Sequence, residues 1–166
     1  LAKIFSQIWR NYGAGRFKKH KISLFHGLSN ELPKGIHKTG IPSIVTIHDL
    51  IFLRFPGFYP FIDRKIYYSK VKYACQSANK IIAISQQTKD DIIRFFGVSP
   101  EKIEIIYQPV SDVFFKPDIA LGEKLLGKYS LRPDFILSVG TLEPRKNQLA
   151  ILKALQKGKF NNQVVF

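Results

Sequence analysis

The sequence predicts an α/β protein in which parallel strands are covered by helices. Short apolar segments that favour strands alternate with longer segments of helical periodicity, and the connections between them are short. With 166 residues and 45% apolar content, the chain can bury a real core, but it fits only one domain or parts of two.

Four strands are expected in the first two thirds of the chain. Each is a short apolar segment that ends at a polar or small residue, over residues 21–27, 43–50, 80–85 and 102–107. A helix is expected over residues 1–12. A longer helix follows Pro60, where an apolar stripe recurs at spacings of three and four through Ile62, Ile66, Tyr67, Val71, Ala74, Cys75 and Ala78.

The helix after the third strand carries its own start and stop signals. Ser85 can cap its first turn, and Gly97 can end it in a left-handed conformation. Ser99 and Pro100 then start one further helical turn.

A change of composition after Tyr107 predicts a second domain. The segment from Gln108 to Asp134 contains three prolines, few β-branched residues and only a weak helix, which is typical of a linker. We predict a first domain over residues 1–110, a linker over 111–132 and the start of a second domain over 133–166. Both ends are expected to be cut, because methionine is absent and the last residues stop inside a strand.

Two cations stand where the second domain's first helix is expected to begin. Residues 135–139 predict a buried strand, Gly140 ends it, and helical periodicity follows over 149–155. Positive charge at a helix start costs ~0.3–1 kcal/mol per residue unless an anion sits opposite. Arg145 and Lys146 therefore predict a phosphate cradle. The alternative, in which both side chains point into water, stays open.

The net charge of +14 limits the partners to anionic ones, such as nucleic acid, anionic lipid or a small phosphorylated ligand. Basic residues concentrate in residues 1–21 and in the helix after Pro60. Nucleic acid is the weaker alternative, because zinc-ligand spacing, an aromatic RNA-binding signature and a short helix-turn-helix are missing. Without a signal peptide or a long apolar run, a cytoplasmic protein is expected. Cys75 is expected to pack inertly in the core.

Polar residues gather at the ends of the predicted strands. They are His26, His48, Asp49 and Ser85 in the first domain, and Arg145 and Lys146 in the second. Because ligands of open parallel sheets bind at the carboxyl ends of strands, we expect these residues to border one cleft between the domains. For each histidine alone, a structural role is the ordinary alternative. The histidines lack the spacing of two ligands on one helical face, so no metal is expected.

Five motifs, in order along the chain, resemble glycosyltransferase family 4. They are HGLSNELP (26–33), TIHDLIFLRFP (46–56), ANKIIAISQQTKDDIIRFFGV (78–98), KIEIIYQPV (102–110) and SVGTLEPRKN (138–147). The resemblance implies the GT-B arrangement of two facing Rossmann-like domains, with the acceptor mostly on the first and a nucleotide-sugar on the second. Mannosyltransferase-like members that build bacterial surface polysaccharides look most similar.

The resemblance also implies roles for single residues. His48 matches a cleft histidine beside the transferring sugar and His26 one near the acceptor, with Asp49 and Ser85 on the same side. Gly140 matches the glycine that lets the donor phosphates approach the backbone. Lys146 matches the lysine that binds the diphosphate, with Arg145 as its helper. Thr141 departs from the pattern, because many members have an arginine there.

The implied function is a retaining transfer of a sugar, with mannose as the first candidate. The donor would be GDP- or UDP-linked, the acceptor a saccharide or a lipid-linked sugar, and no cofactor or metal is implied. His48 would orient the sugar, while a diphosphate oxygen takes the acceptor proton. The family's glycine-rich turn and paired glutamates are missing here, so this chain alone is expected to be inactive and to bind phosphate weakly.

Two alternatives and one surface remain open. The alternatives are a nucleotide- or sugar-binding module without catalysis and a basic nucleic-acid-binding protein. The aromatic segment over residues 53–62, flanked by basic helices, indicates peripheral contact with the inner face of an anionic membrane that holds a lipid-linked acceptor. Ordinary packing of Phe and Tyr under a loop explains the same residues.

Overall fold

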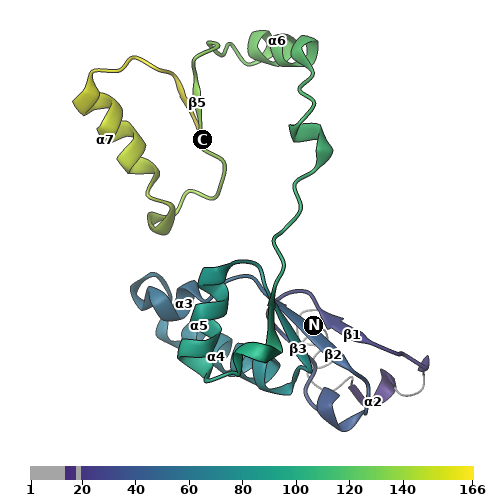
Figure 1. Cartoon of the computed structure of the whole chain (residues 1–166). Helices are drawn as coiled ribbons and strands as arrows, with labels where there is room; N and C mark the ends of the chain where they lie inside the picture. Colours follow the sequence, from purple (N-terminus) through teal and green to yellow (C-terminus); the bar gives the residue numbers. More distant parts are fainter. Residues whose placement is uncertain (1–13, 18–19) are drawn as a thin grey trace, which may run out of the picture. The chain divides into compact units, whose positions relative to one another are not determined.

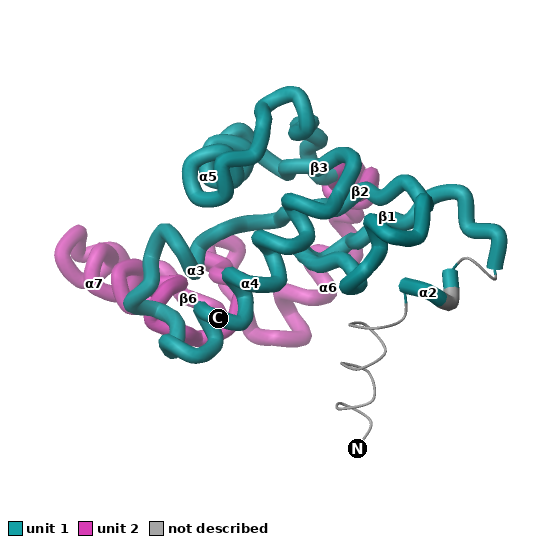
Figure 2. Tube along the Cα trace, turned by 90° about the horizontal axis from the view of Figure 1, so that it is seen from below, with its two compact units in different colours: residues 1–108 teal, residues 109–166 magenta. Residues whose placement is uncertain are grey.

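The computed structural model describes residues 14–17 and 20–166, so the helix expected over residues 1–12 lies outside the described part. The chain divides into two compact units, residues 1–108 and residues 109–166 (Figure 2). They differ sharply in how much of their apolar surface they bury.

Unit 1 contains a parallel sheet of four strands in the order of the sequence. The strands are β1 (Phe25–Gly27), β2 (Ser43–Ile47), β3 (Lys80–Ala83) and β4 (Ile103–Ile105). The strand expected over 21–27 forms only at its end, because β2 begins opposite Phe25. Pro42, just before β2, has no N–H with which to extend the ladder.

Helices α3 (Ile51–Arg54), α4 (Phe61–Ser77) and α5 (Gln86–Phe96) gather on one side of this sheet (Figure 1). A short helix α2 (Ala14–Phe17) and the turns η2 (Ile36–Lys38), η3 (Pro56–Phe58) and η4 (Pro100–Lys102) complete the described part of unit 1. Alternate strand residues point into one core with the helices, namely Val45, Ile47, Ile81, Ala83, Val71, Ala74, Cys75 and Ile92. This arrangement confirms the parallel α/β fold class.

Local signals set both ends of α5 as predicted, and an interaction that was not predicted closes α4. Ser85 caps α5 by accepting a hydrogen bond from the Thr88 N–H at 3.1 Å, and Gly97 ends it with φ 64°. At the end of α4 the Lys102 Nζ donates to the carbonyls of Cys75 and Gln76, each at 2.9 Å. A cation placed there also suits the negative end of the helix.

Cys75 is inert core, as expected. Its side chain is fully buried, and burial raises the pKa of the thiol to about 12. A thiol that stays protonated at neutral pH is a poor nucleophile.

The apolar stripe of α4 is only half buried, which corrects the sequence prediction. Val71, Ala74 and Cys75 are buried, whereas Ile62 is 70% and Ile66 47% exposed. A helix of 17 residues is ~26 Å long, while the five residues of β2 span only ~17 Å. The first turns of α4 therefore extend beyond the sheet.

Unit 2 has secondary structure but little burial. It contains η5 (Asp112–Phe114), α6 (Ile119–Lys128), β5 (Ile136–Leu137), η6 (Pro144–Lys146), α7 (Gln148–Gly158) and β6 (Val164–Val165). The strand expected at the end of the chain is β6, which pairs in parallel with β5.

The strand predicted over residues 135–139 forms only at Ile136–Leu137, as β5, and the prediction that it is buried is wrong. Leu137 is 57% and Val139 86% exposed. The reason is the size of the sheet, since β5 has a single neighbour of two residues. Neither face of so small a sheet can be covered well.

Candidate functional site

Two of the predicted polar residues lie on one face of the sheet in unit 1. Val45 and Ile47 point into the core, so the alternation along β2 directs Thr46 and the following His48 to the other face. His26 is the central residue of the neighbouring β1. Its Nε2 lies 2.8 Å from the Thr46 Oγ1, which ties the two strands together on that face.

His48 is fixed by two neighbours that the sequence did not single out. Its backbone N–H donates to the Asn30 Oδ1 at 2.8 Å, and its ring Nε2 lies 2.8 Å from the Leu28 carbonyl oxygen. Because a carbonyl oxygen only accepts, the Nε2 must carry a hydrogen, which leaves Nδ1 as the acceptor of the neutral ring. The sequence offers one signal of this arrangement, the asparagine at position 30. Asparagine tolerates the left-handed backbone conformation that Asn30 adopts in this loop, with φ 58°.

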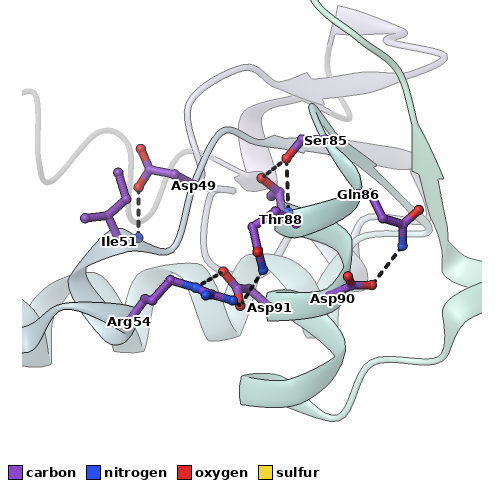
Figure 3. A network of polar contacts seen from close by, with 9 residues as sticks. Asp49, Ile51, Arg54, Ser85, Gln86, Thr88, Asp90 and Asp91 are labelled. Carbon is purple, nitrogen blue, oxygen red and sulfur yellow. Dashed lines mark hydrogen bonds and ion pairs between the residues drawn. The ribbon is translucent and has the colours of Figure 1, made fainter.

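The Ser85 hydroxyl belongs to a hydrogen-bonded network that supports the backbone at His48 (Figure 3). Its hydroxyl accepts from the Thr88 N–H, and the Thr88 Oγ1 donates to the His48 carbonyl at 3.2 Å. Thr88 is almost fully buried. Ser85 thus supports the position of His48 through Thr88.

Asp49 lies next to His48 and organises the turn into α3. Its Oδ1 accepts from the Ile51 N–H at 3.2 Å, and the residue is exposed. Figure 3 also shows Arg54 of α3 reaching Asp91 of α5. The Arg54 Nη2 lies 2.7 Å from Asp91 Oδ1, and this bond raises the pKa of Arg54. Since Asp91 is 4% exposed, the pair joins α3 to α5 at a buried carboxylate.

Two neighbouring pockets open beside these residues. The larger, of about 620 Å³, lies between β1, α4 and the loop after β1, and its lining includes His26, Leu28, Leu32, Lys65, Ile66 and Tyr73. The smaller, of about 310 Å³, is lined by residues that include Asn30, Asp49, Phe52, Tyr59 and Tyr67. Both share Ser29, Glu31 and Lys70 in their walls. The structure thus places His26 and Asp49 in adjacent pockets. His48 is not among the lining residues of either pocket, but its backbone is hydrogen-bonded to Asn30, which lines the smaller one.

Gly27 is required for the shape of this region. A Cβ at that position would collide with the backbone oxygen of Glu31 and with the Leu32 side chain. Only glycine lets the loop after β1 fold back this closely, so the glycine shapes the wall that both pockets share.

In unit 2, the cationic turn is arranged differently from the sequence prediction. Arg145 and Lys146 lie in the turn η6, and Asn147, with φ 51°, separates them from α7. The Arg145 Nη2 lies 2.6 Å from the Glu143 Oε1, and the Thr141 Oγ1 donates to the same oxygen at 2.9 Å. The hydrogen bond from Thr141 and the charge of Arg145 lower the pKa of Glu143.

Glu143 is the functional candidate that sequence reasoning missed in this turn. It neutralises Arg145, whereas Lys146 is exposed and has no ion pair among the residues that the structure describes. Gly140 adopts φ 152°, and a Cβ built there would meet nothing within 4 Å. The positive φ, rather than close packing, favours glycine there, and the backbone around it stays accessible.

Residues 14–17 and 20–166 contain no group of three or more His, Cys, Asp or Glu side chains that could hold a metal ion. Over the same ranges, no helix combines the length and apolar character needed to cross a bilayer.

The fold is that of part of a GT-B glycosyltransferase. A crystal structure of Anabaena Alr3699/HepE in complex with UDP-glucose superimposes with a TM-score of 0.59 over 87% of this chain and 40% of that chain, at 18% identity. The family profile described as Glycosyltransferase Family 4 matches residues 5–113. The chain therefore belongs to glycosyltransferase family 4.

Relatives from two bacteria share this region. The chain is 32% identical over 144 residues to the serotype-specific mannosyltransferase WbdA of Escherichia coli, covering 80% of this chain and 17% of WbdA. It is 32% identical over 89 residues to a Campylobacter jejuni N-acetylgalactosamine-N,N'-diacetylbacillosaminyl-diphospho-undecaprenol 4-alpha-N-acetylgalactosaminyltransferase, covering 53% of this chain and 22% of that enzyme. The chain thus spans about a fifth of the length of either relative.

Proposed function

We propose that this chain forms part of a retaining glycosyltransferase that moves a sugar from a nucleotide-sugar to a saccharide or lipid-linked acceptor. Mannose is the first candidate sugar. The observation that carries the proposal is the family match over residues 5–113, together with the similarity to a mannosyltransferase over most of the chain. The setting would be the synthesis of bacterial surface polysaccharide.

Unit 2 would hold the donor diphosphate through the turn after β5. Breaking a sugar–phosphate bond builds negative charge on the departing diphosphate, and fixed cations and backbone N–H groups stabilise that charge. Lys146 supports this role because it is exposed and unpaired among the described residues. Arg145 would join it on release from Glu143, and the open backbone at Gly140 and Thr141 would admit the phosphates.

Unit 1 would hold the acceptor, near His26, Asp49, Ser85 and His48. The bonds from His48 to Asn30 and Leu28 hold the imidazole in one orientation. This supports a positioning role beside the sugar more than a role as a mobile general base. The HepE structure contains UDP-glucose, which makes a nucleotide-sugar the natural class of donor to test.

The membrane surface proposed here is the segment 53–62 with the first turns of α4. Phe55, Phe58 and Phe61 are all more than half exposed, and the Lys65 Nζ lies 4.5 Å from the centre of the Phe61 ring. Aromatic side chains flanked by cations suit the interface of an anionic bilayer. Co-sedimentation with anionic liposomes at low salt tests this contact, and a protein that stays in the supernatant would exclude it.

Isothermal titration with GDP and UDP tests the donor side. We expect weak binding, with a dissociation constant on the order of 1 mM. Lys146→Gln should weaken it about fivefold, the loss of one charge-assisted contact. Lys153→Gln, an exposed lysine on α7, is the matched control and should change the affinity less than about twofold. Equal effects of the two substitutions would contradict the proposal that the turn after β5 binds the donor diphosphate.

A further inference from the structure

We propose that Glu143 is a built-in anion of the turn after β5, which occupies the cationic site in the free chain and leaves it when a diphosphate binds. The exchange couples diphosphate binding to pH, because the ionised carboxylate competes with the ligand more strongly than the protonated one. This inference rests on the proposed function and adds a form of regulation to that same site.

The Glu143 carboxylate is bound by groups that also bind phosphate. Its Oε1 lies 2.6 Å from the Arg145 Nη2 and accepts a hydrogen bond from the Thr141 Oγ1 at 2.9 Å. Guanidinium groups bind carboxylate and phosphate oxygens through the same charge-assisted hydrogen bonds. The carboxylate and a phosphate oxygen therefore compete for the same donors.

The turn presents more positive charge once this carboxylate leaves. Glu143, Arg145 and Lys146 are the only ionisable residues in the sequence over 138–147, so the segment has a formal net charge of +1. With Glu143 in place, Arg145 is neutralised and Lys146 faces the ligand as a single cation. Displacement of Glu143 gives a diphosphate one cation for each of its two phosphate groups.

The turn can lose this side-chain contact and keep its backbone shape. The Lys146 N–H donates to the Glu143 carbonyl at 2.9 Å, and the Gln148 Nε2 donates to the Thr141 carbonyl at 2.8 Å. Neither bond uses the Glu143 carboxylate. The Glu143 side chain is already 37% exposed, so rotation about its own bonds carries the carboxylate into water.

The direction of the pH dependence follows from the partners of the carboxylate. In the free chain the hydrogen bond from Thr141 and the charges of Arg145 and Lys146 lower the pKa of Glu143. In the complex the carboxylate has lost Thr141 and Arg145 and lies near a negatively charged phosphate, so its pKa is higher there. The complex then holds the proton more tightly than the free chain does. Protonation of Glu143 therefore strengthens diphosphate binding as pH falls.

Titration calorimetry of the full chain with inorganic pyrophosphate, GDP and UDP tests the coupling. At about pH 7.5, Glu143→Gln should bind each ligand about threefold more tightly than the natural chain. This ratio should fall towards one as pH is lowered to about 4, near the ordinary pKa of a glutamate. The titration of the ligand cancels in the ratio, and circular dichroism checks the fold at each pH. A ratio that stays constant over this range would overturn the inference.

Two further variants separate the contact with Arg145 from a general effect of charge. In an Arg145→Gln background, Glu143→Gln should change the affinity less than about 1.5-fold, because the cation for which Glu143 competes is gone. Glu123→Gln, on the exposed surface of α6, removes the same charge elsewhere and should leave the affinity and its pH dependence unchanged. A gain that persists without Arg145, or that Glu123→Gln reproduces, would also overturn the inference.

Lys146→Gln separates a failure of this exchange from a failure of the proposed function. If Lys146→Gln leaves the affinity for GDP and UDP unchanged, the turn does not bind the donor, and the exchange is rejected with it. If Lys146→Gln weakens binding while the ratio between Glu143→Gln and the natural chain stays constant with pH, the exchange alone is rejected. As direct support, the ¹³C signal of the Glu143 carboxyl should titrate at higher pH with pyrophosphate present than without it.

Discussion

The two units contrast in how they are held together. Unit 1 buries side chains such as Ile36, Val45 and Ile47 completely. In residues 109–166, which the structure describes throughout, no side chain is buried, and Phe114 is 76% exposed. Unit 1 is therefore stabilised by a tertiary core, whereas unit 2 depends on local caps and a two-stranded sheet. Local sequence signals are thus enough to form the helices and strands of unit 2, whereas a buried core packs those of unit 1 against one another.

The largest expected difference concerns matched isoleucines. Ile47→Ala deletes fully buried methyl groups in unit 1 and should lower the free energy of unfolding by about 2–5 kcal/mol. Ile119→Ala in unit 2 removes a side chain that is 74% exposed and should change the free energy of unfolding by less than about 0.5 kcal/mol. Urea unfolding followed by circular dichroism measures both. Similar losses would mean that unit 2 has a core after all.

Cys75 links the core of unit 1 to pH. Burial raises the folded pKa of its thiol from 9.0 to about 12, so the folded state holds the proton more tightly. The resulting stability is fully present below pH 9.0 and is lost as pH rises towards 12, by at most about 1.4 kcal/mol per pH unit. Burial lowers the pKa of Lys102, which opposes part of this loss.

Urea unfolding between pH 8 and 10.5, about the range in which that loss begins, measures the slope. Cys75→Ala serves as the control, because its slope should be flatter than that of the natural chain. An identical slope would show that the thiol is not buried in solution.

Helix caps offer a smaller and closely matched comparison. Ser85 caps α5 in unit 1 and Asp118 caps α6 in unit 2, each by accepting a backbone N–H. Ser85→Ala should lower the unfolding free energy of unit 1 by about 1 kcal/mol, the usual value of an N-cap. Asp118→Ala should leave it unchanged, since none of the core residues of unit 1 belongs to α6. If both variants shift the urea midpoint equally, the units unfold as one.

The smallest expected effect lies in the cationic turn of unit 2. Glu143→Gln removes the negative charge that pairs with Arg145 and should strengthen GDP or UDP binding by about threefold. Glu123→Gln, on the exposed surface of α6, should leave the affinity unchanged. Weaker binding by Glu143→Gln, measured by titration calorimetry, would mean that Glu143 positions Arg145 for the ligand instead of competing for it.

Local patterns in the sequence were enough for the elements of unit 1. Short apolar segments that end at polar or small residues located β2 and β3, and the cap residues Ser85 and Gly97 located both ends of α5. What failed was burial. Leu137 and Ile62 belong to apolar patterns but are exposed. A pattern cannot reveal that β5 has one short partner strand, or that α4 extends beyond the sheet.

The candidate site was predicted in part for a similar reason. The place of His48, directly after β2, follows from topology, whereas His26 lies inside β1 and not after it. Their partners do not, because Leu28 contributes a backbone carbonyl and Asn30 folds back from a loop. Glu143 was missed because its pairing with Arg145 depends on a 3₁₀ turn where a regular helix start was expected.

We propose that the turn after β5 is the part of this chain that binds a nucleoside diphosphate. Titrating the ¹⁵N-labelled chain with GDP or UDP and following its amide NMR signals tests the claim directly. We predict shifts concentrated in residues 138–147, with the strands of unit 1 unaffected. Shifts confined to unit 1, or none in that turn at saturating ligand, would contradict it.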